Sequence, residues 1–479
     1  MTSKPEYLLT NKPDTYNNPA IVSSQLTISY RQLFNAVELC AERLIKLGIH
    51  VDERVGIVSP NSIEYIIALI SLWSIKAVAC PFNVRLPELT LKHQMQLINC
   101  QYLLTSEETN TLSQIKQTRL SSIVTDEDFK THHTPKTESE YGLNISIEQK
   151  ATILFTSGSE SNPKAVLHSI GNHIYSAKGS NALIPVFPCD HWLLSLPLYH
   201  VSGLSILFRV LREGGIIVVP GPRENITHVL EHNAITHISL VPTQLARLCA
   251  DEKIKFKLQN FKAILIGGSI IPNTLLQNSL KNKLPVYTTY GLTEMASQVA
   301  TAQYPMPVQP LNYCDVKISN DGEILVKGET LFQGYIEGDT IHLPLTKDGW
   351  FATGDLGSLQ EKEGLIVTGR KDNMFISGGE NIQPEEIEQF LRQLESIEQA
   401  VVVPVQNDEF GFRPVAFIKQ VGESSLKTEK LCRFLENHLP KFKIPDHFYA
   451  WPDDADSSSL KINRPYFTQL ALKNNISVK

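Results

Sequence analysis

Apolar side chains near the N-terminus recur at the spacing of a helix that is buried along one face. Residues 30–47 carry them every three or four positions, and Gly48 follows directly. The apolar positions are Leu33, Val37, Ala41 and Leu44. Glycine is a common residue just past a helix end, because it adopts a left-handed conformation without strain. The pattern therefore predicts a helix that ends just before Gly48.

Short apolar runs on either side of the next helical segment predict parallel strands. Residues 54–58 and 77–81 are such runs, and residues 61–75 between them have helical spacing. Strand, helix and strand in this order give a parallel sheet covered by helices. Strand-like runs followed by helical segments return at residues 192–196, 216–219, 237–240 and 263–266. The sequence thus predicts an α/β fold.

The pattern changes after residues 304–310, which contain three prolines and predict a loop. Shorter strand-like runs with glycine-containing turns then predict a small β subdomain. These runs are residues 315–319, 322–326 and 365–368.

Beyond Gly369 the pattern predicts a compact α+β unit. Its expected helices are residues 384–394 and 427–438, and its expected strands are residues 400–405 and 415–418. We therefore place a domain boundary near residue 370, between an N-terminal body of residues 1–370 and a C-terminal domain of residues 371–479.

The composition is that of an ordinary globular protein, with 42% hydrophobic and 20% charged residues. A length of 479 residues is too great for one hydrophobic core. The net charge is −6 and no basic run occurs, which argues against a nucleic-acid partner because phosphate binding needs concentrated Lys and Arg. Seven scattered cysteines without a CxxC pair predict free, mostly buried thiols in a reducing cytosol.

No targeting or membrane segment is expected from the sequence. The N-terminus is polar and lacks the apolar core of a signal peptide. The best apolar stretch, residues 66–78, is interrupted by Ser71, Ser74 and Lys76, and it is too short to span a bilayer. We therefore expect a cytoplasmic protein without a transmembrane segment.

A first candidate site is FTSGSESNPK at residues 155–164, between a predicted strand (151–154) and a helical stretch (170–180). Hydroxyl and backbone N–H groups can donate to a polyphosphate, and a lysine neutralises its charge. A plain Ser/Gly/Asn/Pro loop has the same composition, so the segment alone leaves both interpretations open.

Two further segments carry groups that can contact a nucleotide. YGLTE at residues 290–294 follows the strand-like run 286–289 and offers an aromatic ring, a threonine and a glutamate that could hold Mg²⁺. An ordinary strand-to-helix turn is the alternative. GWFATGD at residues 349–355 places Asp355 in a glycine-bounded turn. There it could accept both hydroxyls of a ribose, or simply form an Asx-turn.

A fourth segment comprises GRKDN at residues 369–373 and SGGEN at residues 377–381. Its small residues would permit domain rotation and close approach of a thin ligand. The sequence contains no dinucleotide GxGxxG, no Walker A sequence and no HExxH.

Together, in this order and spacing, the four segments resemble the adenylate-forming superfamily of acyl-CoA synthetases, luciferases and peptide-synthetase adenylation domains. The resemblance runs from about Ser29 to Arg464. It implies a large N-terminal domain of layered β-sheets with helices and a small β subdomain, followed by a small mobile α+β C-terminal domain. It also implies that a carboxylate attacks the α-phosphorus of ATP, that pyrophosphate leaves, and that the thiol of coenzyme A then takes the acyl group.

The resemblance further implies roles at matching positions around the triphosphate. The phosphate-loop positions are Thr156, Ser157, Gly158, Ser159 and Lys164. Thr293 matches the phosphate-binding threonine, and Glu294 matches the Mg²⁺ ligand. Lys461, in SLKI, matches the C-terminal lysine that meets the α-phosphate and the acyl oxygen during adenylation.

For the base and ribose the matching positions lie in three segments. Tyr290 matches the adenine-stacking aromatic, followed by Gly291, and Asp355 and Arg370 match the ribose contacts. The segment along the base and acyl pocket is Gly267, Gly268 and Ser269. The hinge falls at Lys371 or Asp372.

One departure from the family pattern concerns the phosphate loop. Glu160 and Ser161 replace the usual Thr-Gly step, and Ala165 replaces the final glycine. A carboxylate beside a triphosphate is repulsive unless it faces solvent or shares the metal. A non-catalytic paralogue that binds nucleotide or acyl-CoA therefore stays open as an alternative.

The acyl side is marked by LPLYHVSG at residues 196–203, which matches the family segment whose histidine, here His200, borders the acyl pocket. Arg209 follows Ser202 by seven residues, in an otherwise apolar run. A buried arginine is costly unless it pairs with an anion. An exposed arginine beside Arg212 on an amphipathic helix is the alternative.

LPLYHVSGLSILFR, YGLTEMASQ and ISGGENIQPEEIE together resemble the o-succinylbenzoate–CoA ligases of menaquinone biosynthesis. In that family a serine and an arginine at the positions of Ser202 and Arg209 hold a substrate carboxylate. The implied substrate positions are His200, Ser202, Arg209, Gly267 and Gly268. The pocket aspartate that is usual in amino-acid adenylation domains is absent.

The expected function is therefore ligation of 2-succinylbenzoate to coenzyme A, with ATP and Mg²⁺. The expected catalytic residues are Lys461, His200, Thr293 and Glu294. A CoA ligase for another aryl or medium-chain acid is the alternative within the same class. The expected partners are small molecules; a homo-oligomer is compatible with the sequence, which does not decide it.

Overall fold

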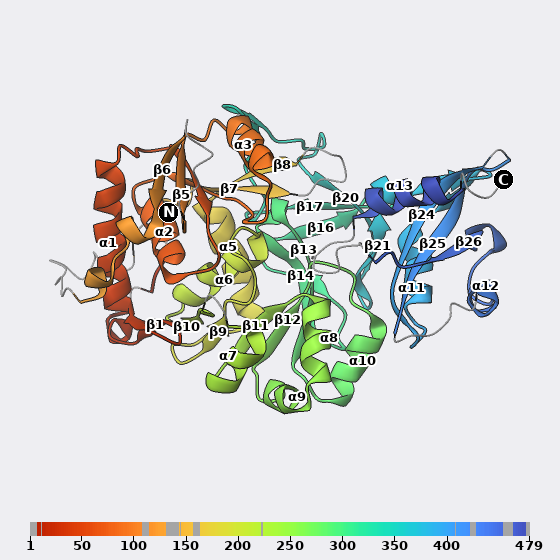
Figure 1. The fold of residues 1–479 in the computed structure, drawn as a ribbon, viewed down its shortest axis with the longest axis horizontal. Helices are drawn as coiled ribbons and strands as arrows, with labels where there is room; N and C mark the ends of the chain where they lie inside the picture. Colours follow the sequence, from red (N-terminus) through yellow and green to blue (C-terminus); the bar gives the residue numbers. More distant parts are fainter. Residues whose placement is uncertain are drawn as a thin grey trace.

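The structure is a computed structural model of the 479-residue chain. Figure 1 shows a large body and a smaller unit formed by the C-terminal residues, drawn in blue. The residues that the structure describes are 7–10, 12–107, 115–130, 143, 145–156, 163–221, 224–407, 409–421, 428–453 and 463–475.

An eight-stranded sheet forms one layer of the body, in the order β19-β18-β8-β7-β4-β3-β5-β6. Its strands are β3 (Arg54–Val58), β4 (Val78–Pro81), β5 (Tyr102–Thr105), β6 (Lys116–Arg119), β7 (Lys150–Thr156), β8 (Lys164–Ser169), β18 (Gly334–Glu337) and β19 (Thr340–His342). β3 pairs parallel with β4, as the strand–helix–strand pattern predicted.

A nine-stranded sheet forms a second layer, in the order β15-β14-β13-β12-β11-β9-β10-β1-β2. Its strands are β1 (Pro19–Val22), β2 (Thr27–Ser29), β9 (His191–Leu193), β10 (Ile216–Val218), β11 (His237–Leu240), β12 (Ala263–Ile266), β13 (Val286–Leu292), β14 (Ser297–Gln303) and β15 (Gln309–Pro310). β11, β12 and β13 pair parallel, so their carboxyl ends meet at one edge.

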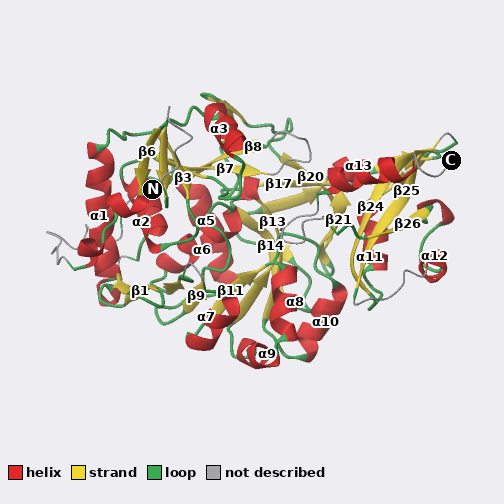
Figure 2. Cartoon of the chain, in the orientation of Figure 1, coloured by secondary structure: helices red, strands yellow, loops and turns green. Residues whose placement is uncertain are grey.

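Helices fill the space between the two sheets and cover their outer faces, as Figure 2 shows in red and yellow. One hydrophobic core joins both sheets to the inner helices α1 (Tyr30–Lys46), α2 (Ile63–Ser74), α5 (Ile170–Leu183) and α6 (Val201–Leu211). The outer helices are α3 (Glu88–Leu97) on the eight-stranded sheet, and α7 (Ile226–His232), α8 (Pro242–Ala250), α9 (Glu252–Leu258) and α10 (Asn273–Lys281) on the nine-stranded sheet. The short α4 (Leu120–Ile123) packs against α1 and α2.

The predicted small β subdomain is a four-stranded sheet, in the order β16-β17-β20-β21. Its strands are β16 (Asp315–Ile318), β17 (Glu323–Lys327), β20 (Phe351–Gln360) and β21 (Gly364–Arg370). Its core is shared with β14 of the nine-stranded sheet. The contact ties the subdomain to the edge where the candidate site lies.

The C-terminal unit is the predicted α+β unit. Its elements are β22 (Phe375–Ser377), β23 (Glu380–Ile382), α11 (Pro384–Leu391), β24 (Ile397–Asn407), β25 (Gly411–Gln420), α12 (Thr428–Glu436), β26 (His447–Ala450) and α13 (Arg464–Asn475). α11 and α12 pack on one face of the sheet and α13 on the other. The fold class is confirmed. The boundary near residue 370 stays a prediction, between the end of β21 and the start of β22.

Several local expectations were wrong, among them the loop predicted over residues 304–310, since Gln309–Pro310 forms strand β15. Asp355 lies inside strand β20, not in a turn, because β20 pairs with both β17 and β21 despite its many small and polar residues. Lys164 begins strand β8, not a loop, because the run that follows it is buried against β7. The helix expected to reach residue 394 ends at Leu391.

The cysteines agree with the expectation of free thiols. All seven are unpaired; five are buried, Cys432 is half-buried and Cys189 is exposed. Within the described ranges, no helix is both long enough and apolar enough to cross a membrane.

Candidate functional site

The strand-to-turn segment at the end of β13 forms the centre of the site. β13 leads directly into a short 3-10 helix, η4 (Thr293–Met295). A Cβ at Gly291 would lie 2.0 Å from the carbonyl oxygen of Ser297, so this close approach of β13 to β14 requires glycine. Thr293 and Glu294 are half-buried at the carboxyl end of a strand, where ligands bind in sheets of this kind.

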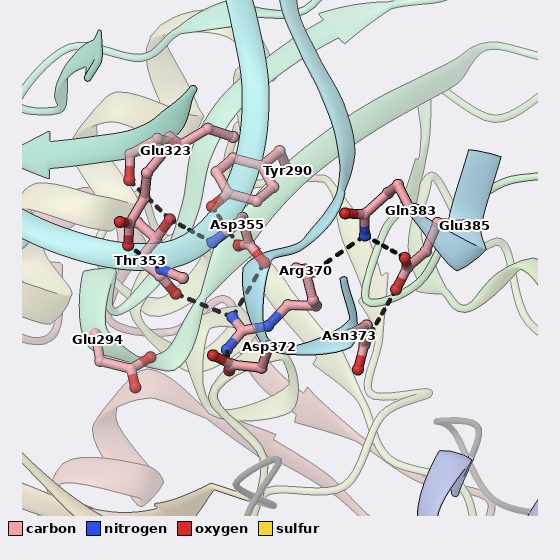
Figure 3. Close-up of polar contacts among 12 residues, drawn as sticks. Tyr290, Glu294, Glu323, Thr353, Asp355, Arg370, Asp372, Asn373, Gln383 and Glu385 are labelled. Atoms are coloured by element: carbon pink, nitrogen blue, oxygen red, sulfur yellow. Dashed lines mark hydrogen bonds and ion pairs between the residues drawn. The ribbon is translucent and has the colours of Figure 1, made fainter. Parts of the chain in front are cut away.

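Three predicted nucleotide contacts meet beside this segment (Figure 3). The Tyr290 hydroxyl donates to Oδ2 of Asp355 at 2.6 Å, and Arg370 Nη1 donates to Oδ1 of Asp355 at 3.0 Å. Arg370 also reaches the carbonyl oxygen of Thr353 at 2.9 Å. Each carboxylate oxygen has a second acceptor position, so Asp355 can still accept hydroxyl groups from a ligand.

In the cluster of Tyr290, Asp355 and Arg370, the charged groups compensate one another. Burial, and then the charge of Asp355, raise the pKa of Tyr290 well above its ordinary value, so the phenol stays a donor. Burial alone would lower the pKa of Arg370, but Asp355 and Asp372 more than offset it and the pKa is raised. The charge of Arg370 is therefore compensated by Asp355 and Asp372 without a ligand.

Glu294, the predicted Mg²⁺ ligand, is held by Tyr335 of β18. The Tyr335 hydroxyl donates to Oε1 of Glu294 at 2.8 Å. Lys164 Nζ lies 5.2 Å from the centre of the Tyr335 ring, a cation–π contact. Carboxylate oxygens are the ligands that Mg²⁺ prefers, and Oε2 is the oxygen that this hydrogen bond does not use. The chemistry of Glu294 therefore fits a magnesium ligand.

The glycine-rich segment predicted along the base follows β12, beside β13. A Cβ at Gly267 would lie 2.6 Å from Cγ2 of Thr289, so the neighbouring strand leaves no room for a side chain. Gly268 and Ser269 are exposed at the same sheet edge. The structure therefore brings this segment next to Tyr290's strand.

On the acyl side, Arg209 is buried in α6, with only 1% of its surface exposed. The alternative of an exposed arginine is wrong. Its Nη2 donates to the hydroxyl of Ser297 at 3.1 Å, and its guanidinium carbon lies 5.7 Å from the centre of the Trp192 ring. Within the described part of the chain, its Nε has no hydrogen-bond partner.

The electrostatics of Arg209 differ from those of Arg370. Burial lowers the pKa of Arg209 to about 9, and no described carboxylate opposes this effect. Ser297, its neutral partner, has a φ of 126°, a conformation that non-glycine residues rarely adopt. Such strain persists where surrounding structure imposes it, often at functional sites.

His200 and Ser202 lie at the start of the same helix. His200 is the N-cap residue of α6, and both residues are half-buried. Residues seven apart lie on one face of a helix, so Ser202 and Arg209 share a face. Ser202 and Arg209 therefore lie on the same side of α6, about two helical turns apart.

The predicted hinge residues are engaged in ion pairs. Lys371 Nζ contacts Oδ2 of Asp321 at 2.7 Å and Oε2 of Glu323 at 2.8 Å. Asp372 accepts from Arg370 Nη2 at 2.9 Å. Glu323 also accepts from the backbone N–H of Gly354, next to Asp355, so the predicted hinge is linked to the cluster of Tyr290, Asp355 and Arg370.

Comparison with known proteins shows which family the chain belongs to. A model described as "AMP-binding enzyme" matches residues 10–336, and one described as "AMP-binding enzyme C-terminal domain" matches residues 386–460. The chain belongs to the AMP-binding enzyme family. A 2-succinylbenzoate–CoA ligase of Bacillus cereus is 30% identical, over 98% of this chain and 99% of that protein. One of Salmonella typhimurium is 31% identical, over 95% of each.

Solved structures of AMP-binding enzymes have the same fold as this chain. The chain is similar to o-succinylbenzoate CoA synthetase of Bacillus subtilis in complex with the acyl-adenylate intermediate OSB-AMP, with a TM-score of 0.84, 28% identity and 98% of both chains covered. That synthetase in complex with ATP and magnesium ion gives a TM-score of 0.80 and 27% identity, covering 94% of this chain and 96% of the other.

Some residues assigned from the family resemblance lie outside the described ranges. They are Ser157, Gly158, Ser159 and Lys461, together with the unusual Glu160 and Ser161. Thr156 and Lys164, at the two ends of the phosphate loop, are described and occupy paired positions of β7 and β8. The roles of all these residues stay predictions.

Other functional candidates were missed by reading the sequence. Tyr335, Ser297 and His168 each contact a residue of the candidate site through the tertiary structure. Ser297 lies within YGLTEMASQ, but nothing in that segment indicates that its hydroxyl meets Arg209. Tyr335 and His168 lie in no such segment, so the sequence carried no signal for these contacts.

Proposed function

We propose that this protein ligates 2-succinylbenzoate to coenzyme A through an acyl-AMP intermediate, with release of pyrophosphate and AMP. Relatives of that name match nearly the whole chain at 30–31% identity. The observation that carries the proposal is the buried positive charge of Arg209, which among the described residues has only a neutral hydroxyl as side-chain hydrogen-bond partner. A substrate with a second carboxylate supplies the missing anion.

The substrates are the acid, ATP and coenzyme A, and Mg²⁺ is the cofactor. In the first half-reaction one carboxylate of the acid attacks the α-phosphorus, and pyrophosphate departs. In the second, the thiol sulfur attacks the acyl carbonyl, the thiol proton is lost and AMP departs. No covalent enzyme intermediate is needed, so the protein contributes positioning and charge stabilisation.

The protein's own residues divide this task. Asp355 holds the ribose hydroxyls, Arg370 fixes the Asp355 carboxylate, and Tyr290 lies against the adenine. Thr293 and Lys164 contact the phosphates, together with the rest of the phosphate loop. Mg²⁺, when held by Glu294, neutralises charge on the phosphate oxygens.

The remaining residues act on the acid and on the reacting atoms. Arg209 and Ser202 hold the second carboxylate of the acid, with His200 at the mouth of the acyl pocket. Lys461 stabilises charge at the α-phosphate, after rotation about Lys371 or Asp372. Gly267 and Gly268 line the space between the base and the acyl group.

The deciding experiment is pyrophosphate release with 2-succinylbenzoate, with and without coenzyme A. We expect release with this acid, followed by thioester formation when coenzyme A is present. Preference for another aryl or medium-chain acid in a substrate panel would support the alternative ligase. ATP binding without pyrophosphate release from any acid would support a non-catalytic paralogue.

The Arg209→Ala variant tests the assignment of the acid. We expect it to weaken the use of acids with a second carboxylate and to leave benzoate-like acids less affected. An equal effect on both classes would make Arg209 a structural residue.

Three further properties are proposed on the same basis. The protein works in the cytoplasm, in menaquinone biosynthesis as the resemblance implies, and its two domains meet near residue 370. Homo-oligomerisation, which the sequence leaves undecided, is measurable by light scattering of the full chain.

A further inference from the structure

Three buried side chains beneath the site form a hydrogen-bonded chain. Thr152 of β7, His168 of β8 and His173 of α5 are each no more than 1% exposed. His173 Nε2 lies 2.9 Å from the Thr152 hydroxyl oxygen, which lies 3.3 Å from His168 Nδ1. His168 Nε2 lies 2.7 Å from the backbone carbonyl oxygen of Thr293. The chain therefore ends on the residue that precedes Glu294.

The carbonyl oxygen at the end of this hydrogen-bonded chain determines which atoms carry the protons. A carbonyl oxygen can only accept, so His168 must carry its proton on Nε2. In the neutral ring Nδ1 is then an acceptor, and Thr152 donates its hydroxyl proton to it. The Thr152 oxygen accepts in turn from Nε2–H of His173. Burial lowers the pKa of both histidines, that of His168 to about 4, which agrees with neutral rings.

The hydrogen-bonded chain of His173, Thr152 and His168 contacts a turn whose other polar groups are also held by hydrogen bonds. The Thr293 carbonyl also accepts from the backbone N–H of Ala296 at 3.0 Å, and the Glu294 carbonyl accepts from Phe332 N–H at 2.8 Å. The Glu294 side chain is held by Tyr335. His168 supplies the side-chain donor to the Thr293 carbonyl, and it comes from a different sheet than η4 does.

We propose that His168 is a positioning residue for adenylation, holding the Thr293–Glu294 turn so that the threonine and the carboxylate keep the geometry that a magnesium-bound triphosphate needs. The inference rests on the proposed function of these two residues. Residues that orient a metal ligand without touching the metal affect affinity and rate by their own geometry. His168 is well placed for this, because its other nitrogen is fixed by Thr152 and its ring cannot turn freely.

Two amide substitutions separate the contacts of His168. Its Nε2, a donor, is three bonds from Cβ, as is the amide nitrogen of glutamine. Its Nδ1, which accepts from Thr152, is two bonds from Cβ, as is the amide oxygen of asparagine. His168→Gln therefore keeps a donor near the Thr293 carbonyl, whereas His168→Asn keeps only the contact to Thr152. Tyr30→Phe is the control, because it removes a similar buried bond, from the Tyr30 hydroxyl to the Gly215 carbonyl at 2.6 Å, away from the site.

The measurements are the rate of pyrophosphate release, the rate of thioester formation from supplied acyl-AMP, and the Mg²⁺ dependence of ATP binding by calorimetry. For His168→Asn we expect adenylation to fall by about tenfold or more, with a higher Mg²⁺ requirement for ATP binding. Thioester formation should change by less than about threefold. His168→Gln should recover most of the loss, and Tyr30→Phe should match the wild type.

Equal behaviour of the Asn and Gln variants, or equal loss in both half-reactions, would overturn the positioning role. If the Asn variant does not fold, the Gln variant and Thr152→Val decide by the same split between half-reactions. If the wild type releases no pyrophosphate with any acid, the proposed function has failed. The positioning claim is then judged on Mg²⁺-dependent ATP binding alone.

Discussion

The two ends of the candidate site differ in the partners of their arginines, Arg370 at one end and Arg209 at the other. At the nucleotide end, Arg370 is paired with Asp355 and Asp372, and Asp355 also accepts from Tyr290. At the acyl end, Arg209 is more deeply buried than Arg370, yet its side-chain hydrogen bond goes to the neutral hydroxyl of Ser297. At the first end each named charge has an opposite charge beside it, whereas at the second the guanidinium has no described carboxylate beside it. This difference is the basis for proposing that Arg209 binds the second carboxylate of the acid.

The largest effect is expected from removing the charge of Lys461, which belongs to neither end of the site. Lys461→Ala should slow adenylation by about 10²- to 10³-fold, because it deletes the cation that we propose stabilises charge developing on the α-phosphate. Thioester formation from supplied acyl-AMP should survive. Separate assays of the two half-reactions check this, and equal loss in both would contradict the assigned role.

At the nucleotide end, Asp355→Asn tests a charge that is paired. It keeps an acceptor for Tyr290 but leaves Arg370 without this carboxylate. We expect the KM for ATP to rise by about ten- to a hundredfold, because hydrogen bonds to charged groups are strong. The free energy of unfolding should fall by about 1 kcal/mol or less, since Arg370 is partly exposed and keeps Asp372.

At the acyl end, Arg209→Met tests a charge that is unpaired. The KM for 2-succinylbenzoate should rise by about tenfold or more, as the anion loses its partner. The free energy of unfolding should stay constant or rise by about 1 kcal/mol, because a buried uncompensated charge is replaced by an apolar side chain. Steady-state kinetics and denaturant unfolding measure the two effects. A loss of several kcal/mol in stability would remove the contrast between the two ends.

The smallest expected effect concerns His168, the buried neutral histidine that contacts the Thr293 carbonyl. The pKa of His168 is lowered from 6.5 to about 4, so its stabilising contribution is fully present above pH 6.5 and is lost as the pH falls toward 4. At about pH 5.5 the loss should be about 1 kcal/mol. His168→Gln, which does not titrate, should show a flatter dependence of unfolding free energy on pH than the wild type and Tyr30→Phe. Parallel curves would show that His168 is not buried and neutral.

Reading the sequence located most elements of the body because their apolar spacing is local information. Strands β3, β11 and β12 have the predicted bounds, and Gly48 follows α1 with a left-handed φ of 86°. Asp355 escaped this reading because β20 has few β-branched residues and becomes a strand only by pairing on both sides. Its bonding partners, Tyr290 and Arg370, were nevertheless expected beside it from the family resemblance.

The sequence by itself determined the alternation of strands and helices, the order of the four candidate nucleotide-binding segments and the presence of an arginine in the apolar helix. Only the tertiary structure decided that Arg209 is buried, that Ser297 is its partner, and that His168 reaches Thr293 from another sheet. The reason is physical. Periodicity reports which face of an element is apolar, but burial of a charge and the identity of its partner depend on segments that are distant in the chain and meet only in the folded protein.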